Sequence, residues 1–371
     1  MSKARDSVED LRTIDADLAG LQTNITAGDT AARAGRKNLI INGGMQVAQR
    51  GTSDTSFTAG YKTCDRWRIG NNQGYSNNSQ PTVTQSTDAP AGFGHSMRLV
   101  IGTDAGAAGS TSAAEVSQFF EGQDLQHLEY GTATAKTLTA SLWVKSSLTG
   151  IFSARIGLPD NSRSHANSFT INTANTWEKK TLTFAGDTTT AIANTNTSVM
   201  YFAIHHGYGS GYVTSNTTSW QSGTYMGPSG NTNLGDTAGA SFQFTGVQLE
   251  VGSGTDFEHR SYGEELQLCK RYWRRDVYRT GILPWAGSAG GTSQVTWPLN
   301  PEMRGSPTIS TNATPSYSNI LGTAGPVGQT GTSTSDAVSR GATANGVYIS
   351  NNASGSTLYA VTADLTADAE L

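Results

Sequence analysis

Residue types that enzymes use for acid–base or metal chemistry are sparse in this chain and do not cluster. Glu121 and Asp124 form a carboxylate pair in a glycine-containing turn, which could act as a glycosidase pair or as calcium ligands. The adjacent His205 and His206 would point to opposite faces of a strand, so they cannot chelate one ion together. No HExxH, GxSxG or Walker motif occurs. We therefore expect no catalytic residues and no cofactor, with calcium as the one ion that the pair could bind.

Two predicted strands carry residues suited to binding. Alternation over residues 136–147 and 150–158 places one set of side chains toward a core and the other set outward. The outward set includes Trp143, Lys145 and Arg155. An outward tryptophan beside cationic and hydroxyl side chains suits a sugar, because the ring can stack and the polar groups can bind hydroxyls. The alternative is that a loop or a neighbouring subunit covers Trp143.

The segment 205–227 adds aromatic residues on a background of glycine and serine. Tyr208, Tyr212 and Trp220 lie in it, and this mixture is typical of binding loops. The same rings could instead anchor the loop to the domain below it. Both interpretations follow from composition alone, so the sequence leaves them open.

Composition favours a β protein without affinity for nucleic acid. Charged residues make up 15% of the 371 residues and glycine contributes 43, a mixture that suits short strands joined by turns. The net charge is −4, so no global field attracts the protein to nucleic acid or to an acidic membrane. The N-terminus has no apolar signal segment and no stretch is long enough to span a membrane, which predicts synthesis in a cytoplasm. Cys64 and Cys269 are predicted to be buried and unpaired.

The N-terminal region, residues 1–35, is predicted to be a helix followed by a linker. Apolar residues over 6–27 are spaced three and four apart, as in the seam of a coiled coil. The seam consists of Leu11, Ile14, Leu18, Leu21 and Ile25. A helix of this length is marginal alone, so we expect it to self-associate or to dock on a partner. The alternative is one amphipathic helix packed on its own domain.

The remaining chain is predicted to be mostly β. Short apolar segments separated by turns run from residue 38 and include 39–42, which predicts a sandwich or jelly roll over 36–262. Residues 263–277 have a helical period, with acidic residues first and basic residues last, and predict a connecting helix. Residues 278–371 predict a second, small β domain. Pairs of Glu258 or Glu264 with Arg260 or Arg271 are expected to fix the joint, unless these charges are simply solvated.

Three segments together resemble a known family. Residues 36–70, 136–189 and 244–273 resemble tail-fibre and related virion appendage proteins of tailed bacteriophages, whose central jelly roll is similar to bacterial carbohydrate-binding modules. The resemblance implies a homotrimer in the virion, attached to other tail proteins by its N-terminus. It also implies binding to a host surface polysaccharide or protein. Alternatives are a structural adaptor or head-decorating protein, and an enzyme that cuts capsule polysaccharide.

Overall fold

The computed structural model describes residues 36–56, 58–72, 81–102, 109–160, 162–283, 293–311, 316–319, 342–343, 346–351 and 359–371. The chain divides into two compact units, Met1–Leu39 and Ile40–Leu371, and the strands all belong to the second. The predicted N-terminal helix and its seam lie outside the described residues. No helix within the described part is long and apolar enough to cross a membrane.

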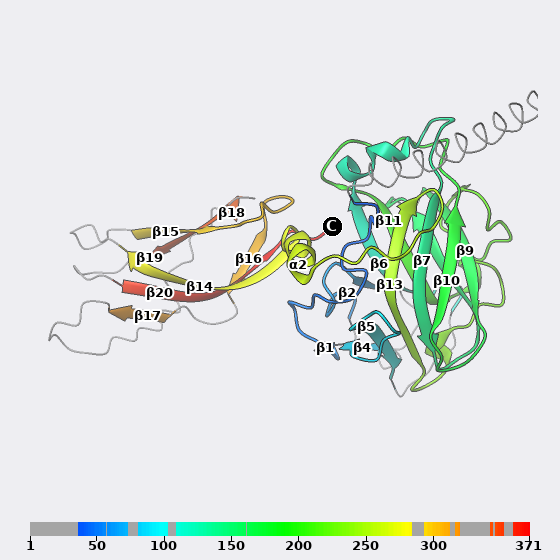
Figure 1. Cartoon of the computed structure of the whole chain (residues 1–371), viewed down its shortest axis with the longest axis horizontal. Coiled ribbons are helices and arrows are strands. Elements are labelled where there is room, and N and C mark those ends of the chain that lie inside the picture. The colour runs from blue at the N-terminus through cyan, green and yellow to red at the C-terminus, as the bar shows by residue number, and fades with distance from the viewer. Residues whose placement is uncertain are drawn as a thin grey trace, which may run out of the picture. The chain divides into compact units, whose positions relative to one another are not determined.

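Two antiparallel sheets form the predicted sandwich (Figure 1). The six-stranded sheet has the order β1 (Ser53–Asp54), β4 (Pro81–Ser86), β5 (Ser96–Ile101), β13 (Ser241–Val251), β7 (Leu138–Ser146) and β10 (Glu178–Phe184). The seven-stranded sheet has the order β12 (Gln221–Ser222), β9 (Arg163–Ile171), β8 (Gly150–Gly157), β11 (Ser198–Tyr208), β6 (Ala113–Glu121), β3 (Arg68–Asn72) and β2 (Gly60–Tyr61). The chain crosses repeatedly between the sheets, at β1–β2, β3–β4, β5–β6, β6–β7, β7–β8, β9–β10, β10–β11 and β12–β13, as in a jelly roll.

The core lies between these sheets and follows from strand alternation. In β7, Leu138, Ala140, Leu142 and Val144 are fully buried, as the period of two predicts. Aromatic rings from the two sheets meet across the core: Phe152 of β8 lies 5.2 Å from Phe242 of β13 between ring centres. The two cysteines are buried and free, as predicted.

The C-terminal region is also β, as predicted. One sheet has the order β14 (Trp273–Leu283), β20 (Tyr359–Asp368) and β16 (Thr308–Thr311), with β17 (Ser316–Asn319) also paired to β20. A second sheet has the order β15 (Ser293–Pro298), β19 (Gly346–Asn351) and β18 (Ala342–Thr343). A small apolar cluster packs on one face of the first sheet and comprises Leu299, Met303, Leu365, Ala367 and Ala369.

The connecting helix is shorter than predicted. α2 spans Tyr262–Lys270 and begins with a capping box, in which Ser261 and Glu264 each bind the other's backbone N–H. The prediction of a helix up to residue 277 is wrong, because β14 begins at Trp273 and pairs with β20 almost a hundred residues later. A local helical period cannot reveal a strand partner that distant in sequence.

An ion-pair joint lies where α2 meets the sandwich. Arg260 lies 3.3 Å from Glu258 and 3.4 Å from Glu265, which confirms one of the predicted pairs. Arg271 does not pair with Glu258 or Glu264. It donates two hydrogen bonds, of 3.0 and 2.8 Å, to Glu121 at the end of β6. The charge-rich segment is therefore a joint rather than a solvated helix face.

Several local features differ from the prediction: β4 and β6 are strands that were not predicted, and one predicted strand is absent. Residues 39–42 do not form the predicted strand: the chain bends at 41–42, where Asn42 adopts a left-handed conformation and hydrogen-bonds Val47 through its side chain. β6, which lies in the middle of the seven-stranded sheet, was not predicted, because its sequence AAEVSQFFE lacks regular alternation.

Candidate functional site

The sandwich separates residues that the sequence grouped together. β7 belongs to the six-stranded sheet and β8 to the seven-stranded sheet, and each turns its apolar side chains toward the shared core. Trp143 and Lys145 of β7 therefore lie on the outer face of the first sheet, whereas Arg155 of β8 lies on the outer face of the second. These three side chains cannot contact one ligand together.

Trp143 and Lys145 belong to a group that we call the aromatic face. It consists of Phe93, Trp143, Lys145, Trp177, Asp88 and Gln243. Strand pairing sets their order, because Trp143 lies opposite Lys179 of β10 and Thr245 of β13, while Lys145 lies opposite Gln243. Trp177 immediately precedes β10. Its ring centre lies 5.1 Å from the Lys145 ammonium, within the range of a cation–π contact.

Asp88 is the polar centre of the aromatic face. It pairs with Lys145 and accepts hydrogen bonds from the Trp177 indole at 3.2 Å and from the Gln243 amide at 3.4 Å. The Lys145 hydrogen bond, followed by that of Trp177, holds the pKa of Asp88 below its ordinary value despite partial burial. Asp88 is therefore ionised at neutral pH and orients both the cation and the indole.

A bulge in β13 makes room for Phe93 and Trp143, the two rings of the aromatic face that lie near Gly246. The pairing of β13 with β7 shifts register between Thr245 and Gln248, and Gly246 there has φ +60°. A Cβ at Gly246 would lie 2.6 Å from the Phe93 ring and 3.1 Å from the Trp143 ring. Only glycine fits this close approach, and it allows both rings to lie against the backbone.

The resulting surface has the chemistry of a sugar-binding platform. Phe93, Trp143 and Trp177 are half-buried, so each is supported by the protein and still presents part of its ring. The apolar C–H face of a sugar ring can pack on such rings, and its hydroxyls can exchange hydrogen bonds with the charged groups beside them. Asp88 is exposed, with half of its side-chain surface open to solvent.

On the opposite outer face, Arg155 lies beside a carboxylate and an aromatic ring, as Lys145 does, but these groups are shielded from solvent. It is buried, lies 3.1 Å from Glu115, and its guanidinium lies 4.9 Å from the centre of the Tyr201 ring. Its Nε and Nη1 find no hydrogen-bond partner within the described part of the chain. Arg155 thus forms a buried ion pair in this structure.

The predicted loop aromatics pack against the protein. Tyr208 is buried, donates a hydrogen bond of 2.9 Å to the Pro228 carbonyl, and belongs to an apolar cluster against which Tyr212 packs. The Trp220 indole donates a hydrogen bond of 2.8 Å to the Ala185 carbonyl. These contacts correspond to the anchoring role that the sequence left open.

Glu121, one member of the candidate acid–base or calcium pair, is likewise engaged. Both carboxylate oxygens of Glu121 accept hydrogen bonds from Arg271, and Tyr272 adds another of 2.7 Å. Among the described residues, no group of three histidine, cysteine or acidic side chains could hold a metal ion. Glu121 is therefore a residue of the joint in this arrangement.

Four members of the aromatic face, Phe93, Asp88, Trp177 and Gln243, were not predicted from the sequence. Trp177 lies two residues before Lys179 and four before Thr181, which both point outward from β10. Extending the alternation of this strand by two residues toward the N-terminus would therefore have predicted that Trp177 points outward as well. Phe93 and Asp88 lie in the connection between β4 and β5. No local signal places them over β7 and β13, because that contact depends on the tertiary fold.

Comparison with known proteins yields fold-level likenesses only. No protein-family model and no curated protein matches the chain. Among solved structures, it is similar to the enzymatically active domain of bacteriophage CBA120 tailspike protein 4, at 13% identity and TM-score 0.33 over 58% of this chain and 21% of that one. It is also similar to a family 11 carbohydrate-binding module of Clostridium thermocellum, at 12% identity and TM-score 0.27 over 55% and 99%.

A further likeness is to the N-terminal cellulose-binding domain of Cellulomonas fimi β-1,4-glucanase C, at 11% identity and TM-score 0.27 over 56% and 100% of the two chains. The chain thus spans about a fifth of the tailspike chain and nearly all of the two modules. At these scores the likenesses carry no argument about a ligand. The site is argued from its own geometry.

Proposed function

We propose that this protein binds glycan through the aromatic face. The observation that carries the proposal is that two half-buried tryptophans, Trp143 and Trp177, lie on the outer face that carries the Lys145–Asp88 pair, and that Trp177 contacts both members of the pair. Rings that are already held in place lose little conformational freedom when a ligand binds, which favours binding. Hydrogen-bonding groups on the same face as two rings suit a ligand that combines C–H faces and hydroxyls, as an oligosaccharide does.

Binding accounts for this surface better than catalysis does. Hydrolysis of a glycosidic bond needs an acid and a second carboxylate that flank the reacting bond. On the aromatic face, Asp88 is the one carboxylate, and it already accepts hydrogen bonds from a lysine, an indole and an amide. The role proposed for the chain is therefore recognition and not cleavage.

The biological setting that we propose is a virion appendage of a tailed phage. The resemblance of residues 36–70, 136–189 and 244–273 to tail-fibre proteins supports it, and the N-terminal seam is compatible with a trimer. Three copies would present three aromatic faces, so weak individual contacts to host surface glycan would combine into tight attachment. A structural adaptor or head-decorating role is the second candidate, and the hydrogen-bonded joint of Arg271 and Glu121 would serve it equally.

The test is glycan binding by single-residue variants of the full chain. A glycan array selects the oligosaccharide, and calorimetry then measures its affinity. Trp177→Ala and Trp143→Ala should each weaken binding about tenfold, with unfolding midpoints near wild type. Tyr262→Ala is the matched control, because Tyr262 is an aromatic residue on α2 that is 56% exposed.

The outcomes separate the candidate roles. Wild-type affinity in both tryptophan variants would rule out the aromatic face as the site. Unfolding of Trp143→Ala would show that Trp143 is a core residue, and Trp177→Ala would then decide the question alone. No binding on the array, together with tight binding to a tail or capsid protein, would favour the adaptor role.

A further inference from the structure

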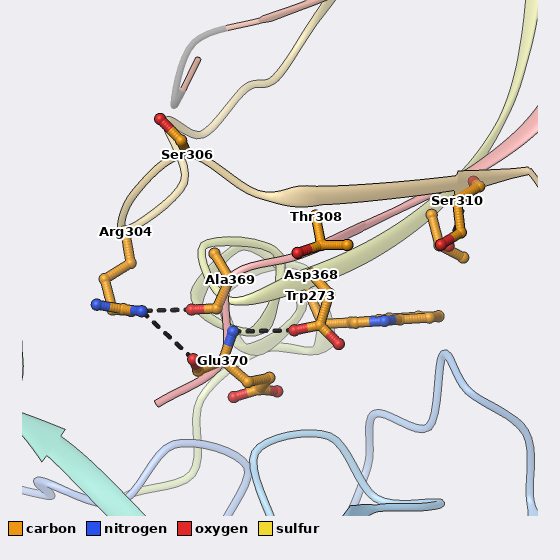
Figure 2. A pocket seen from close by; sticks show the side chains of 9 residues that line it. Trp273, Arg304, Ser306, Thr308, Ser310, Asp368, Ala369 and Glu370 are labelled. Carbon is orange, nitrogen blue, oxygen red and sulfur yellow. Dashed lines mark hydrogen bonds between the residues drawn. The ribbon is translucent and has the colours of Figure 1, made fainter. Parts of the chain in front are cut away.

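A cavity of about 480 Å³ opens on the first C-terminal sheet, where β14 begins and β20 ends (Figure 2). Its size falls within the range of small-molecule sites, roughly 300–1,000 Å³. The lining that matters for the argument consists of Trp273, Arg304, Thr308, Ser310, Thr366 and Asp368. None of these residues belongs to the aromatic face.

Strand register places this lining in two rows. Asp368 of β20 lies opposite both Trp273 of β14 and Thr308 of β16, and Thr366 lies opposite Ser310 in the next row. Intervening residues such as Leu365 and Ala367 point to the other face, into the small apolar cluster. The lined part of the sheet therefore has one apolar, covered face and one face of hydroxyls with a carboxylate; the exposed Arg275, which lies opposite Thr366 on β14, is not part of the lining. Figure 2 shows Thr308 and Asp368 beside the Trp273 ring.

The floor of the cavity is held in place before any ligand arrives. Trp273 is only 8% exposed, the Arg50 guanidinium lies 4.4 Å from its ring centre, and Gln49 donates a hydrogen bond of 3.0 Å to its carbonyl. The chain that follows β20 is fixed by Glu370, which pairs with Arg50 and Arg66. A preorganised site binds with less loss of conformational entropy.

Of the two charged side chains that matter in the cavity, Arg304 is occupied by protein carbonyls, whereas Asp368 can still bind a ligand. Arg304 donates to the carbonyls of Ala369 at 2.8 Å, Glu370 at 3.3 Å and Asn196 at 2.9 Å, so it is a poor anion receptor. Asp368 accepts one hydrogen bond, of 3.0 Å, from the Glu370 amide, and about half of its side-chain surface is exposed. Its other oxygen lies 3.9 Å from Arg50 and can accept further hydrogen bonds.

The hydroxyls and the single available carboxylate of the lining indicate which class of ligand the cavity could bind. An apolar ligand would find mostly hydroxyls and a carboxylate, whose desolvation is unfavourable without hydrogen bonds. An anion would meet the Asp368 carboxylate, because the nearest guanidinium of the lining is occupied by carbonyls. A neutral polyhydroxylated ligand can donate to Asp368 and exchange hydrogen bonds with Thr308, Ser310 and Thr366.

We propose that this cavity is a second carbohydrate site, which takes a neutral sugar residue and is independent of the aromatic face. The inference rests on the proposed glycan-binding function for its ligand class and on the cavity for its position. With two sites on each chain, an assembly could bind one polysaccharide at more points than it has chains, which would raise its avidity.

The experiment uses the full chain, neutral tetrasaccharides (cellotetraose and xylotetraose) and tetragalacturonate as the anionic comparator. Saturation-transfer NMR and calorimetry measure binding to wild type and to two pocket variants, Asp368→Asn and the double variant Thr308→Val with Ser310→Ala. Each should weaken the pocket site about tenfold, because each removes an acceptor charge or two hydroxyl partners. Thr170→Val, an exposed threonine on β9, is the matched control.

The results distinguish the two proposals. Two binding events in wild type, one lost in the pocket variants and the other lost in Trp177→Ala, would support both. Pocket variants that bind like wild type, while Trp177→Ala loses all binding, would overturn the pocket and leave the aromatic face intact. Tighter binding of tetragalacturonate than of the neutral sugars would overturn the ligand class. Wild type that binds neither these sugars nor any glycan on the array would overturn both.

Discussion

The two outer faces of the sandwich carry the same chemical trio in an open and a closed form. On the six-stranded sheet, Lys145, Trp177 and Asp88 combine a cation, an aromatic ring and a carboxylate, with side-chain exposures of 14% for Lys145 and 49% for Asp88. On the seven-stranded sheet, Arg155 and Glu115 show 5% and 13%, beside the Tyr201 ring.

Similar distances in the two trios show that proximity does not separate a binding surface from a structural ion pair. The cation lies 5.1 Å from the ring centre in the open trio and 4.9 Å in the closed trio. What differs is access to water. An exposed pair contributes little to stability and can exchange partners, whereas a buried pair is needed to compensate desolvated charge. The open trio is therefore the one suited to a ligand.

The largest expected effect comes from breaking the closed trio. Arg155→Ala leaves the Glu115 carboxylate without its cation in a mostly buried place, and we expect a loss of roughly 3–5 kcal/mol in unfolding free energy. Urea denaturation measures it, and glycan affinity of the folded protein should not change. A loss under about 1 kcal/mol would mean that the closed trio behaves like the open one.

Low pH should affect the two faces differently, because the buried His205 and His206 lie on β11 of the sheet that carries the closed trio. Burial lowers the pKa of His206 from 6.5 to about 4, and burial together with the Arg155 charge lowers that of His205 well below 6.5. The unfolded chain then binds more protons, so stability falls as pH drops from 6.5 toward 4, by about 2 kcal/mol for His206 at pH 4.5.

Asp65 acts in the opposite direction over part of this range. Burial raises its pKa to about 6, against a lowering by the Gln49 hydrogen bond, so its protonation favours the folded state as pH falls from about 6 to 3.8. Urea denaturation at pH 7 and pH 4.5 should still show a net loss, and His206→Gln should reduce it. At pH 5 glycan affinity should persist, because the pKa of Asp88 lies below its ordinary value. If wild type and His206→Gln lost the same unfolding free energy between pH 7 and pH 4.5, this account would be contradicted.

Gly246→Ala tests the bulge that shapes the open face. The added methyl would meet Phe93 and Trp143 at φ +60°, and we expect a loss of about 1–2 kcal/mol together with weaker glycan binding. Gly252→Ala is the control, because φ there is +80° but nothing lies within 4 Å of its Cβ position. Equal effects of the two variants on affinity would show that the rings are not positioned by Gly246.

Lys145→Ala should have the smallest effect on stability. It removes a pair whose carboxylate is half exposed and keeps contact with water, so the unfolding free energy should change by less than about 1 kcal/mol. Glycan affinity should fall roughly threefold, because Trp177 and Asp88 lose the cation between them. A stability loss as large as that of Arg155→Ala would remove the distinction between the two faces.

Local patterns predicted most strands and part of the site. β7, β8 and β13 were predictable because alternation of apolar and polar residues follows directly from the pleat, and Trp143 and Lys145 were assigned outward on the same grounds. β6 was not predicted, since its small and charged residues show no alternation. The helix after residue 262 was predicted, but its end was not, because β14 depends on pairing with β20.

The sequence by itself determined a β protein whose strands have an apolar side and a polar side, since side-chain direction along a strand alternates whatever the partners are. Only the tertiary structure decided which polar sides share a surface. Trp143 and Arg155 are twelve residues apart in the sequence but lie on opposite faces, while Asp88, Lys145 and Trp177 come together from three separate segments. The physical reason is that burial between two sheets selects the inner face of each strand, and strand pairing over long distances then sets the neighbours on the outside.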